Sequence, residues 1–350
     1  MSVAAFDGQL APVDKMLVSY GTLTQRAMQM SLPEREPRSW LYDLVSSYPA
    51  RGGKAIRPSL CLATCGAFGG GIAEALPSAT AIELMHNAFL IHDDIEDESL
   101  LRRGAATLHA THGSALALNA GDALFVTAQQ CVLANVDVLG PRLARRVADE
   151  FVLMAQRTTE GQATELGWMR DNVVDLTPDD YLDMVMRKTC WYTTVHPLRV
   201  GALVGSWGSA PLEPFVRFGF HLGAAFQIQD DLLNLFGDEA RYGKEILGDL
   251  LEGKRTLMLI HLLRTVRGSD REHLVAYLGR PRSSRSLAEA RHVRDLMVAN
   301  GSADFARQFA QGIAYEAETS FERAFGARAA ETRDGQFVRG LISYMLDRTS

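Results

Sequence analysis

Two acidic clusters stand in otherwise apolar, helix-forming sequence: His92-Asp93-Asp94-Ile95-Glu96-Asp97 and Gln229-Asp230-Asp231-Leu232-Leu233-Asn234. Both have the form Asp-Asp-x-x-Asp/Asn. Burying a carboxylate without a partner costs several kcal/mol, so two such clusters indicate that a cation lies between them. Oxygen ligands favour a hard ion such as Mg²⁺, which commonly binds together with phosphates. The clusters therefore indicate a site for magnesium and a phosphorylated compound.

The spacing within each cluster ranks its members as metal ligands. Asp93 and Asp97 lie one helical turn apart, so both can point at one site. Asp94 points about 100° away and is better placed to pair with a neighbouring side chain. Asp230 and Asn234 repeat this spacing, but a carboxylate with an amide oxygen is a weaker site, and Asp231 lies off their face. The alternative for either cluster alone is a solvated acidic face or a helix end.

Basic residues next to glycine accompany both clusters. They occur in Gly52-Gly53-Lys54-Ala55-Ile56-Arg57-Pro58, Arg102-Arg103-Gly104, Gly243-Lys244 and Gly253-Lys254-Arg255-Thr256. Glycine lets backbone amides approach a phosphate, while lysine supplies a point charge and arginine a bidentate fork. None of these segments has the Gly-x4-Gly-Lys-Ser/Thr pattern of a P-loop. Each segment alone is also compatible with an exposed turn.

Helical periodicity dominates the elements that must position these residues. Apolar side chains recur at three- and four-residue spacing over 78–97, 114–134, 141–158, 178–190, 211–235, 255–267 and 287–328. Thr177-Pro178 predicts a helix start, and 249–253 and 279–284 read as loops. We expect a single all-α domain over residues 1–350, with residues 1–35 as a peripheral arm.

Composition excludes several classes of protein. The formal charge of −6 argues against a nucleic-acid-binding surface, which is usually basic. The four cysteines lack zinc-site spacing and are expected to be buried free thiols. No uncharged run approaches the roughly 18 to 20 apolar residues that span a bilayer, and the N-terminus lacks a signal-peptide pattern. We therefore expect a cytoplasmic protein without a transmembrane segment.

Together these segments resemble the trans-isoprenyl diphosphate synthase (polyprenyl synthetase) family, from about residue 45 to residue 260. The similarity includes 52–58, 82–104, Lys188-Thr189 and 226–254, and four of the five lysines fall within it. The resemblance implies the isoprenoid synthase fold, antiparallel helices around a central cavity, and a homodimer. It also implies Mg²⁺-dependent, head-to-tail condensation of isopentenyl diphosphate with an allylic diphosphate.

The resemblance assigns roles by position. Three Mg²⁺ ions would be bound by Asp93, Asp97 and Asp230. Isopentenyl diphosphate would be held by Lys54, Arg57, His86 and Arg103. The allylic diphosphate would be held by Arg102, Lys188, Lys244 and Lys254, and the developing cation would face oxygen dipoles from Thr189 and Gln227. Without the resemblance, His86 reads as an ordinary core histidine. Ala55 and Asn234 depart from the commonest family pattern, which has arginine and aspartate there.

Phe89 is the candidate for setting product length. It lies one turn before Asp93 on the same face, so its ring should obstruct the channel beneath the metal site. Ala88, beside it, is small; in the family, bulky residues at both positions accompany a C15 product, and one aromatic is compatible with C20. The alternative for Phe89 is ordinary core packing. We expect geranylgeranyl diphosphate, with farnesyl diphosphate as the next choice.

Two other functions remain open from the sequence. A class I terpene cyclase shares the acidic chemistry and the all-α fold, but it needs no second substrate, so Lys54, Arg57 and His86 would have no purpose. A non-catalytic partner subunit of a prenyl diphosphate synthase would be expected to have lost metal ligands. This chain retains both acidic clusters.

Overall fold

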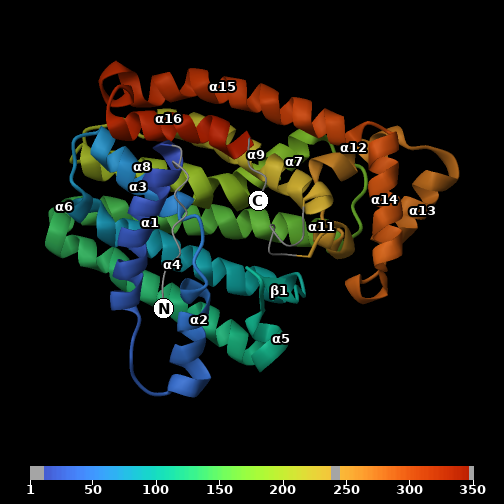
Figure 1. The fold of residues 1–350 in the computed structure, drawn as a ribbon, viewed down its shortest axis with the longest axis horizontal. Coiled ribbons are helices and arrows are strands. Elements are labelled where there is room, and N and C mark those ends of the chain that lie inside the picture. The colour runs from blue at the N-terminus through green and yellow to red at the C-terminus, as the bar shows by residue number, and fades with distance from the viewer. Residues whose placement is uncertain (1–11, 238–244, 347–350) are drawn as a thin grey trace.

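The computed structural model describes residues 12–237 and 245–346, which are almost entirely helical (Figure 1). The first half contains α1 (Pro12–Ser31), α2 (Asp43–Ala50), α3 (Ile56–Ala67), α4 (Ile72–Glu96), α5 (Leu108–His112) and α6 (Ser114–Arg170). The second half contains α7 (Pro178–Val185), α8 (His196–Gly205), α9 (Glu213–Phe236), α11 (Gly248–Glu252), α12 (Leu257–Thr265), α13 (Gly268–Leu278), α14 (Leu287–Ala299), α15 (Ser302–Ala330) and α16 (Arg333–Leu346). The all-α prediction is confirmed.

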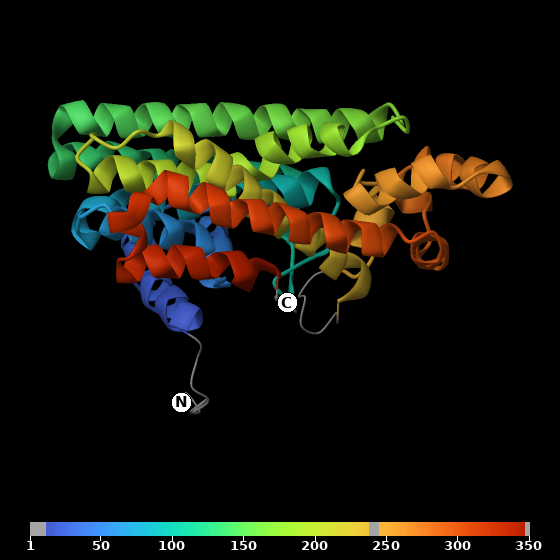
Figure 2. The same cartoon turned by 90° about the horizontal axis from the view of Figure 1, so that it is seen from above.

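A few short elements connect these helices. They are the π-helices η1 (Arg38–Tyr42) and η2 (Met186–Val195), the 3₁₀ helix η3 (Arg282–Ser284), and an antiparallel pair of strands, β1 (Leu101–Arg102) and β2 (Ala105–Ala106). In the second view, α13 and α14 project from one end of the main bundle (Figure 2). The remaining long helices lie roughly side by side around the centre.

Two buried helices carry the acidic clusters. α4 packs along α6 and α3, and α9 packs along α15 and η2. Leu84 and Ile91 on α4, and Phe218 and Ile228 on α9, are at most 1% exposed. Full burial of one such side chain stabilises the fold by about 1.5–3 kcal/mol, so core packing fixes both helices firmly. Each helix ends within a few residues of its cluster, which leaves the acids near the helix ends.

α6 consists of two helical segments that break between 134 and 141, where the sequence suggested a break. The non-helical residue is Gly140, with φ 72°, and Pro141 starts the second segment. This conformation suits glycine, and proline suits the first turn that follows. The second segment continues to Arg170 rather than stopping near residue 158, because its inward face stays buried through Glu165.

α6 exposes large apolar side chains, with Leu118, Val126, Leu133 and Val136 forming a stripe on its first segment and Val152 on its second. Among residues 12–237 and 245–346, α6 is also the one helix that could cross a membrane by length and composition. Its most apolar 18-residue stretch has a mean hydropathy of 1.3 and is 39% buried. This is weak evidence for a membrane span, since core helices of soluble proteins share the same properties.

The segment predicted as one helix over 178–190 is divided. α7 begins as expected, with Thr177 as N-cap accepting from the Asp180 backbone N–H. After Val185 the winding changes to the π type and continues as η2 to Val195. Because a π-helix has more residues per turn than an α-helix, it changes which side chains face the neighbouring helices. Lys188 and Thr189 lie within this segment.

Three further differences have local causes. The expected helix over 287–328 is split because Gly301 adopts φ 71° after α14. The expected loop at 249–253 contains the five-residue helix α11. In the N-terminal segment, α1 buries Met16, Leu17 and Tyr20 in the hydrophobic core. All four cysteines are buried free thiols, as expected.

Candidate active site

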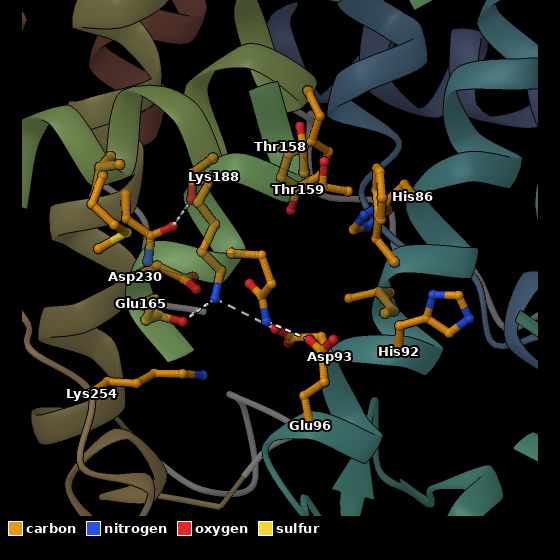
Figure 3. Close-up of a pocket in the computed structure, with 18 of the residues that line it drawn as sticks. His86, His92, Asp93, Glu96, Thr158, Thr159, Glu165, Lys188, Asp230 and Lys254 are labelled. Atoms are coloured by element: carbon orange, nitrogen blue, oxygen red, sulfur yellow. Dashed lines mark hydrogen bonds and ion pairs between the residues drawn. The ribbon is translucent and has the colours of Figure 1, made fainter. Parts of the chain in front are cut away.

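A cavity of about 630 Å³ between α4, α6, η2 and α9 collects most of the expected site residues. Figure 3 shows Asp93 and Glu96 on one wall, facing Lys188, Asp230 and Lys254 on the other. The expected residues that line it are Arg57, His86, Phe89, Asp93, Arg102, Arg103, Lys188, Thr189, Gln227, Asp230, Asp231 and Lys254. Acidic groups far apart in the chain thus form opposing walls of one cavity.

Asp94 lies buried behind Asp93 and organises its surroundings. Tyr48 Oη donates a 2.5 Å hydrogen bond to Asp94 Oδ2, and Arg102 Nε donates a 2.8 Å hydrogen bond to Asp94 Oδ1. Arg102 Nη2 also lies 3.3 Å from Asp93 Oδ2. Burial alone would lower the pKa of Arg102, but Asp94 and Asp93 together raise it well above its ordinary value. Asp94 therefore anchors Arg102, which in turn orients Asp93.

Asp97 is buried beneath Lys254, whose Nζ donates a 2.5 Å hydrogen bond to Asp97 Oδ2. Burial raises the pKa of Asp97 to about 7; Lys254 opposes this shift, and Asp93 and Glu252 reinforce it. Within the described part of the chain, Asp97 Oδ1 has no hydrogen-bond partner. An unpartnered buried carboxylate oxygen one turn from Asp93 is a position that a divalent cation would satisfy.

The second cluster places Asp230 in the cavity and Asp231 in a buried pocket of hydrogen-bond donors. Tyr181 Oη donates to Asp231 Oδ2 at 2.8 Å, and Gln227 Nε2 donates to Asp231 Oδ1 at 2.7 Å. Burial raises the pKa of Asp231 to about 7, although these two donors oppose the shift. Asp231 thus holds Gln227 and Tyr181 in place beside Asp230.

Asn234 faces backbone rather than the cavity. Its Oδ1 accepts a 3.1 Å hydrogen bond from the Asp249 N–H, and its Nδ2 donates to the Glu245 carbonyl at 3.4 Å. An amide can accept and donate at once, whereas an ionised aspartate can only accept. The departure from aspartate at this position therefore serves to join α9 to the chain that returns toward Lys254.

Lys188 bridges the two walls. Its Nζ forms an ion pair with Glu165 on α6 and lies 3.6 Å from Asp93 Oδ1 (Figure 3). Burial alone would lower the pKa of Lys188, but Glu165 and Asp93 together raise it above its ordinary value. Glu165 was not identified from the sequence. The sequence feature that accompanies Glu165 is Gly161, one turn earlier. An added Cβ at Gly161 would lie 2.2 Å from the Lys188 backbone nitrogen, so glycine is needed for this close approach.

Thr189 and Gln227 meet at the cavity wall. Thr189 Oγ1 donates a 3.0 Å hydrogen bond to Gln227 Oε1. Because Gln227 also donates to Asp231, its amide orientation is fixed from both sides. Both side chains line the cavity together with Lys188 and Asp230.

Arginine and histidine residues form the other polar end of the cavity. Arg57 Nη1 lies 3.3 Å from His86 Nε2, and Arg103 lines the same end. The Arg103 guanidinium packs on Gly53, where an added Cβ would be 2.9 Å from Nη2. Glycine at position 53 therefore gives Arg103 the space to reach the cavity.

Lys54 lies on the far side of Arg103. It lines an adjoining cavity of about 480 Å³ under α1, and Arg103 lines both cavities. The structure therefore places Lys54 in a cavity shared with Arg103, one of the other three expected isopentenyl diphosphate ligands, and not in the main cavity. Lys244, expected among the allylic diphosphate ligands, lies outside the described residues.

The apolar floor lies below Asp93. Phe89 lines the cavity and packs edge-to-face against Phe125 and Tyr192, with ring centroids 5.2 and 5.6 Å away. Ala88 is fully buried in the core instead. Phe125 and Tyr192 were not identified from the sequence, because a single aromatic at helical spacing is indistinguishable from core packing.

The donor set suits magnesium bound jointly with a phosphate ligand. Within residues 12–237 and 245–346, no three acidic, histidine or cysteine side chains converge on one point. Mg²⁺ is commonly held by one or two carboxylates plus substrate phosphate oxygens, so a complete protein cage is not required. Asp93 and Asp230 provide such carboxylates on opposing walls of the cavity, and Asp97 adds a buried Oδ1 that has no hydrogen-bond partner among the described residues.

Comparison with known proteins identifies the family to which this chain is similar. The sequence profile of the polyprenyl synthetase family matches residues 38–296. A short chain isoprenyl diphosphate synthase from Methanothermobacter thermautotrophicus is 34% identical, covering 75% of this chain and 79% of its own. A geranylgeranyl diphosphate synthase from Sulfolobus acidocaldarius is 31% identical, covering 88% and 90%.

Solved structures agree with this result. The crystal structure of geranylgeranyl pyrophosphate synthetase from Pyrococcus horikoshii Ot3 superposes with a TM-score of 0.84 at 28% identity. The match covers 97% of this chain and 100% of that one. The two chains therefore share one fold.

Proposed function

The chain belongs to the polyprenyl synthetase family, and on that premise we propose that it condenses isopentenyl diphosphate head-to-tail with an allylic diphosphate. The observation that carries the proposal is a single cavity with two separate polar ends above an apolar floor. One end combines opposed carboxylates with Lys188 and Lys254, and the other combines Arg57, His86 and Arg103. Two anionic head groups and one growing hydrocarbon chain fit this division.

Magnesium fits the acidic end of this cavity. We assign Asp93, Asp97 and Asp230 as its protein ligands and expect three ions per active site, as is typical of the family. When bound, the metal neutralises the diphosphate and makes it a better leaving group. Lys188 and Lys254 add further positive charge for the diphosphate on the wall opposite Asp93 (Figure 3).

Ion pairs within the chain occupy these cations when no substrate is bound. Lys188 contacts Glu165 and Asp93, and Lys254 contacts Asp97 and Glu252 at 2.5 and 2.8 Å. A diphosphate entering the cavity would take over these contacts, and the carboxylates released from the lysines would be free to hold the metal. Substrate binding is then an exchange of partners, which avoids leaving a buried charge unpaired.

The reaction follows from the two ends. The allylic C–O bond breaks and its electron pair leaves with the diphosphate, giving an allylic carbocation. Thr189 and Gln227 line the cavity, and their oxygen dipoles would stabilise the positive charge. The double bond of isopentenyl diphosphate, held by Arg57, His86, Arg103 and Lys54, then attacks the cation. A proton lost to the departing diphosphate restores a double bond, and the chain is five carbons longer.

Product length follows from the floor. We propose geranylgeranyl diphosphate, with farnesyl diphosphate as the next choice, because Phe89 closes the cavity beneath Asp93 while Ala88 adds no bulk. The Phe89→Ala variant should give longer products in chromatography of the dephosphorylated chains. Unchanged product length would overturn Phe89 as the limit.

We further propose that the enzyme is a cytoplasmic homodimer with one domain per chain. The apolar stripe on α6 is the surface that a second copy would cover, since large exposed apolar patches mark interaction sites. The two hydrophobic clusters of the core both pack against Ile313 and Leu346, which supports a single domain. Replacing Val126 with glutamate should shift the sedimentation profile from dimer to monomer.

The decisive test is turnover. Purified protein with Mg²⁺, isopentenyl diphosphate and C5, C10 or C15 allylic diphosphates should yield elongated prenyl diphosphates. Cyclic hydrocarbon would instead identify a terpene cyclase, and absence of turnover a non-catalytic subunit. Asp175→Asn, an exposed carboxylate between α6 and α7, is the matched control for substitutions of the cavity aspartates.

A further inference from the structure

Tyr192 lies on η2 between the arginine end of the cavity and its floor. Its hydroxyl oxygen accepts a 2.9 Å hydrogen bond from Arg57 Nη2, and the guanidinium carbon lies 4.5 Å from its ring centroid. Its ring also stacks on His86, with centroids 5.9 Å apart and planes 29° apart. Tyr192 therefore contacts two residues that face the isopentenyl diphosphate position.

The same ring reaches the floor. It meets Phe89 edge-to-face at 5.6 Å, and Phe89 meets Phe125 in the same way at 5.2 Å. Aromatic rings prefer this arrangement, so each neighbour restrains the Phe89 ring. Removal of the Tyr192 ring would remove one of the two aromatic supports that Phe89 has in the described part of the chain.

Arg57 depends on hydroxyl groups for its orientation. Nη2 donates to Tyr192 Oη and to Thr193 Oγ1, both at 2.9 Å. Among the described residues, the buried Nε of Arg57 has no hydrogen-bond partner. Because the guanidinium is planar, holding Nη2 also fixes the direction of its other N–H groups. Two hydroxyls thus set how Arg57 presents itself to a diphosphate.

We propose that Tyr192 is a positioning and specificity-determining residue with two separable roles. Its hydroxyl orients Arg57 for isopentenyl diphosphate, and its ring supports Phe89 and so helps to set product length. The inference deepens the proposed prenyl transfer and rests on it. One side chain then joins the binding site of the second substrate to the limit on chain growth.

Four variants separate the two roles. Tyr192→Phe keeps the ring and removes the hydroxyl, so KM for isopentenyl diphosphate should rise about tenfold with unchanged product length. Thr193→Val removes the other hydroxyl on Arg57 and should act in the same direction. Phe125→Leu removes the other support of Phe89 and should lengthen the product, with KM changed by less than about twofold. Tyr192→Leu should show both effects together.

The outcomes distinguish this inference from the proposed function. If the wild type elongates the chain, two results overturn the inference and leave prenyl transfer intact. One is a normal KM for isopentenyl diphosphate in Tyr192→Phe, and the other is an unchanged product length in Tyr192→Leu. Without wild-type turnover the proposed function fails. The hydroxyl role is then judged by calorimetric titration with isopentenyl diphosphate, where equal affinity of wild type and Tyr192→Phe rejects it. Thermal melting of each variant identifies any loss of folding, and a KM rise shared by Thr193→Val excludes a general packing defect.

Discussion

The two acidic clusters share a plan in their first two residues and diverge at the third. In each, the first aspartate (Asp93, Asp230) faces the cavity, and the second (Asp94, Asp231) is buried and accepts from a tyrosine hydroxyl, Tyr48 or Tyr181. Asp94 additionally pairs with Arg102, whereas in the described part of the chain the donors to Asp231 are the neutral groups of Tyr181 and Gln227. The third position is a buried carboxylate under Lys254 in one cluster and an amide bound to backbone in the other. Two similar sequence motifs therefore place their third residues in different structural roles.

The largest effect should come from the cavity-facing aspartates. Asp93→Asn and Asp230→Asn should each lower kcat/KM by about a hundredfold to a thousandfold, because each removes charge at the proposed metal site. Steady-state kinetics at saturating Mg²⁺ measures this. Asp175→Asn should stay near wild type. A loss below tenfold in either cavity variant would remove that cluster from the metal site.

The buried second aspartates should differ in stability. Asp94→Asn removes the negative charge that pairs with the buried guanidinium of Arg102. Breaking such a buried ion pair lowers the free energy of unfolding by about 3–5 kcal/mol. Asp231→Asn keeps an acceptor for one of two neutral donors and should cost about 1 kcal/mol. Urea unfolding of the metal-free protein gives both values. Equal costs would show that the charge of Arg102 does not distinguish the clusters.

The pH dependence of stability should also separate them. The pKa of Asp231 is about 7 when folded, against an ordinary value of 3.8, so the folded state holds this proton more tightly. Its contribution to stability grows as pH falls from about 7 toward about 4 and is lost as pH rises back to 7. The difference between wild type and Asp231→Asn should change by up to about 1.4 kcal/mol per pH unit in that window. Parallel curves in chelator would refute the raised pKa.

The smallest effect concerns the third position. Asn234→Asp should lower the free energy of unfolding by about 1 kcal/mol, because an aspartate cannot donate to the Glu245 carbonyl. It should not tighten Mg²⁺ binding, since the side chain faces backbone. Calorimetric titration with Mg²⁺ and substrate analogue checks the second point. Tighter metal binding in this variant would restore position 234 as a ligand.

Much of this arrangement was readable in the sequence. The i, i+4 spacing predicted that Asp94 would pair with a neighbouring side chain, as it does with Arg102, and helical periodicity predicted the all-α fold. Other features depended on contacts between distant segments. Glu165 meets Lys188 because Gly161 lets η2 approach α6, and neither a π-helix nor such an approach has a periodic signal. The two-sided backbone contacts of Asn234 depend on a chain segment that returns to α9.

The packing of α1 and α16 has a practical consequence. A Cβ at Gly21 would lie 3.1 Å from Ala55, so α1 presses directly on the Gly-Gly-Lys turn, and Ala55 leaves it room. Tyr20 Oη donates a 2.5 Å hydrogen bond to Asp334 on α16, and Lys54 Nζ lies 6.0 Å from the ring of Tyr344. α1 and α16 thus brace the turn that carries Lys54. Substitutions on these two helices that disturb the contacts should alter substrate affinity without changing a residue of the main cavity.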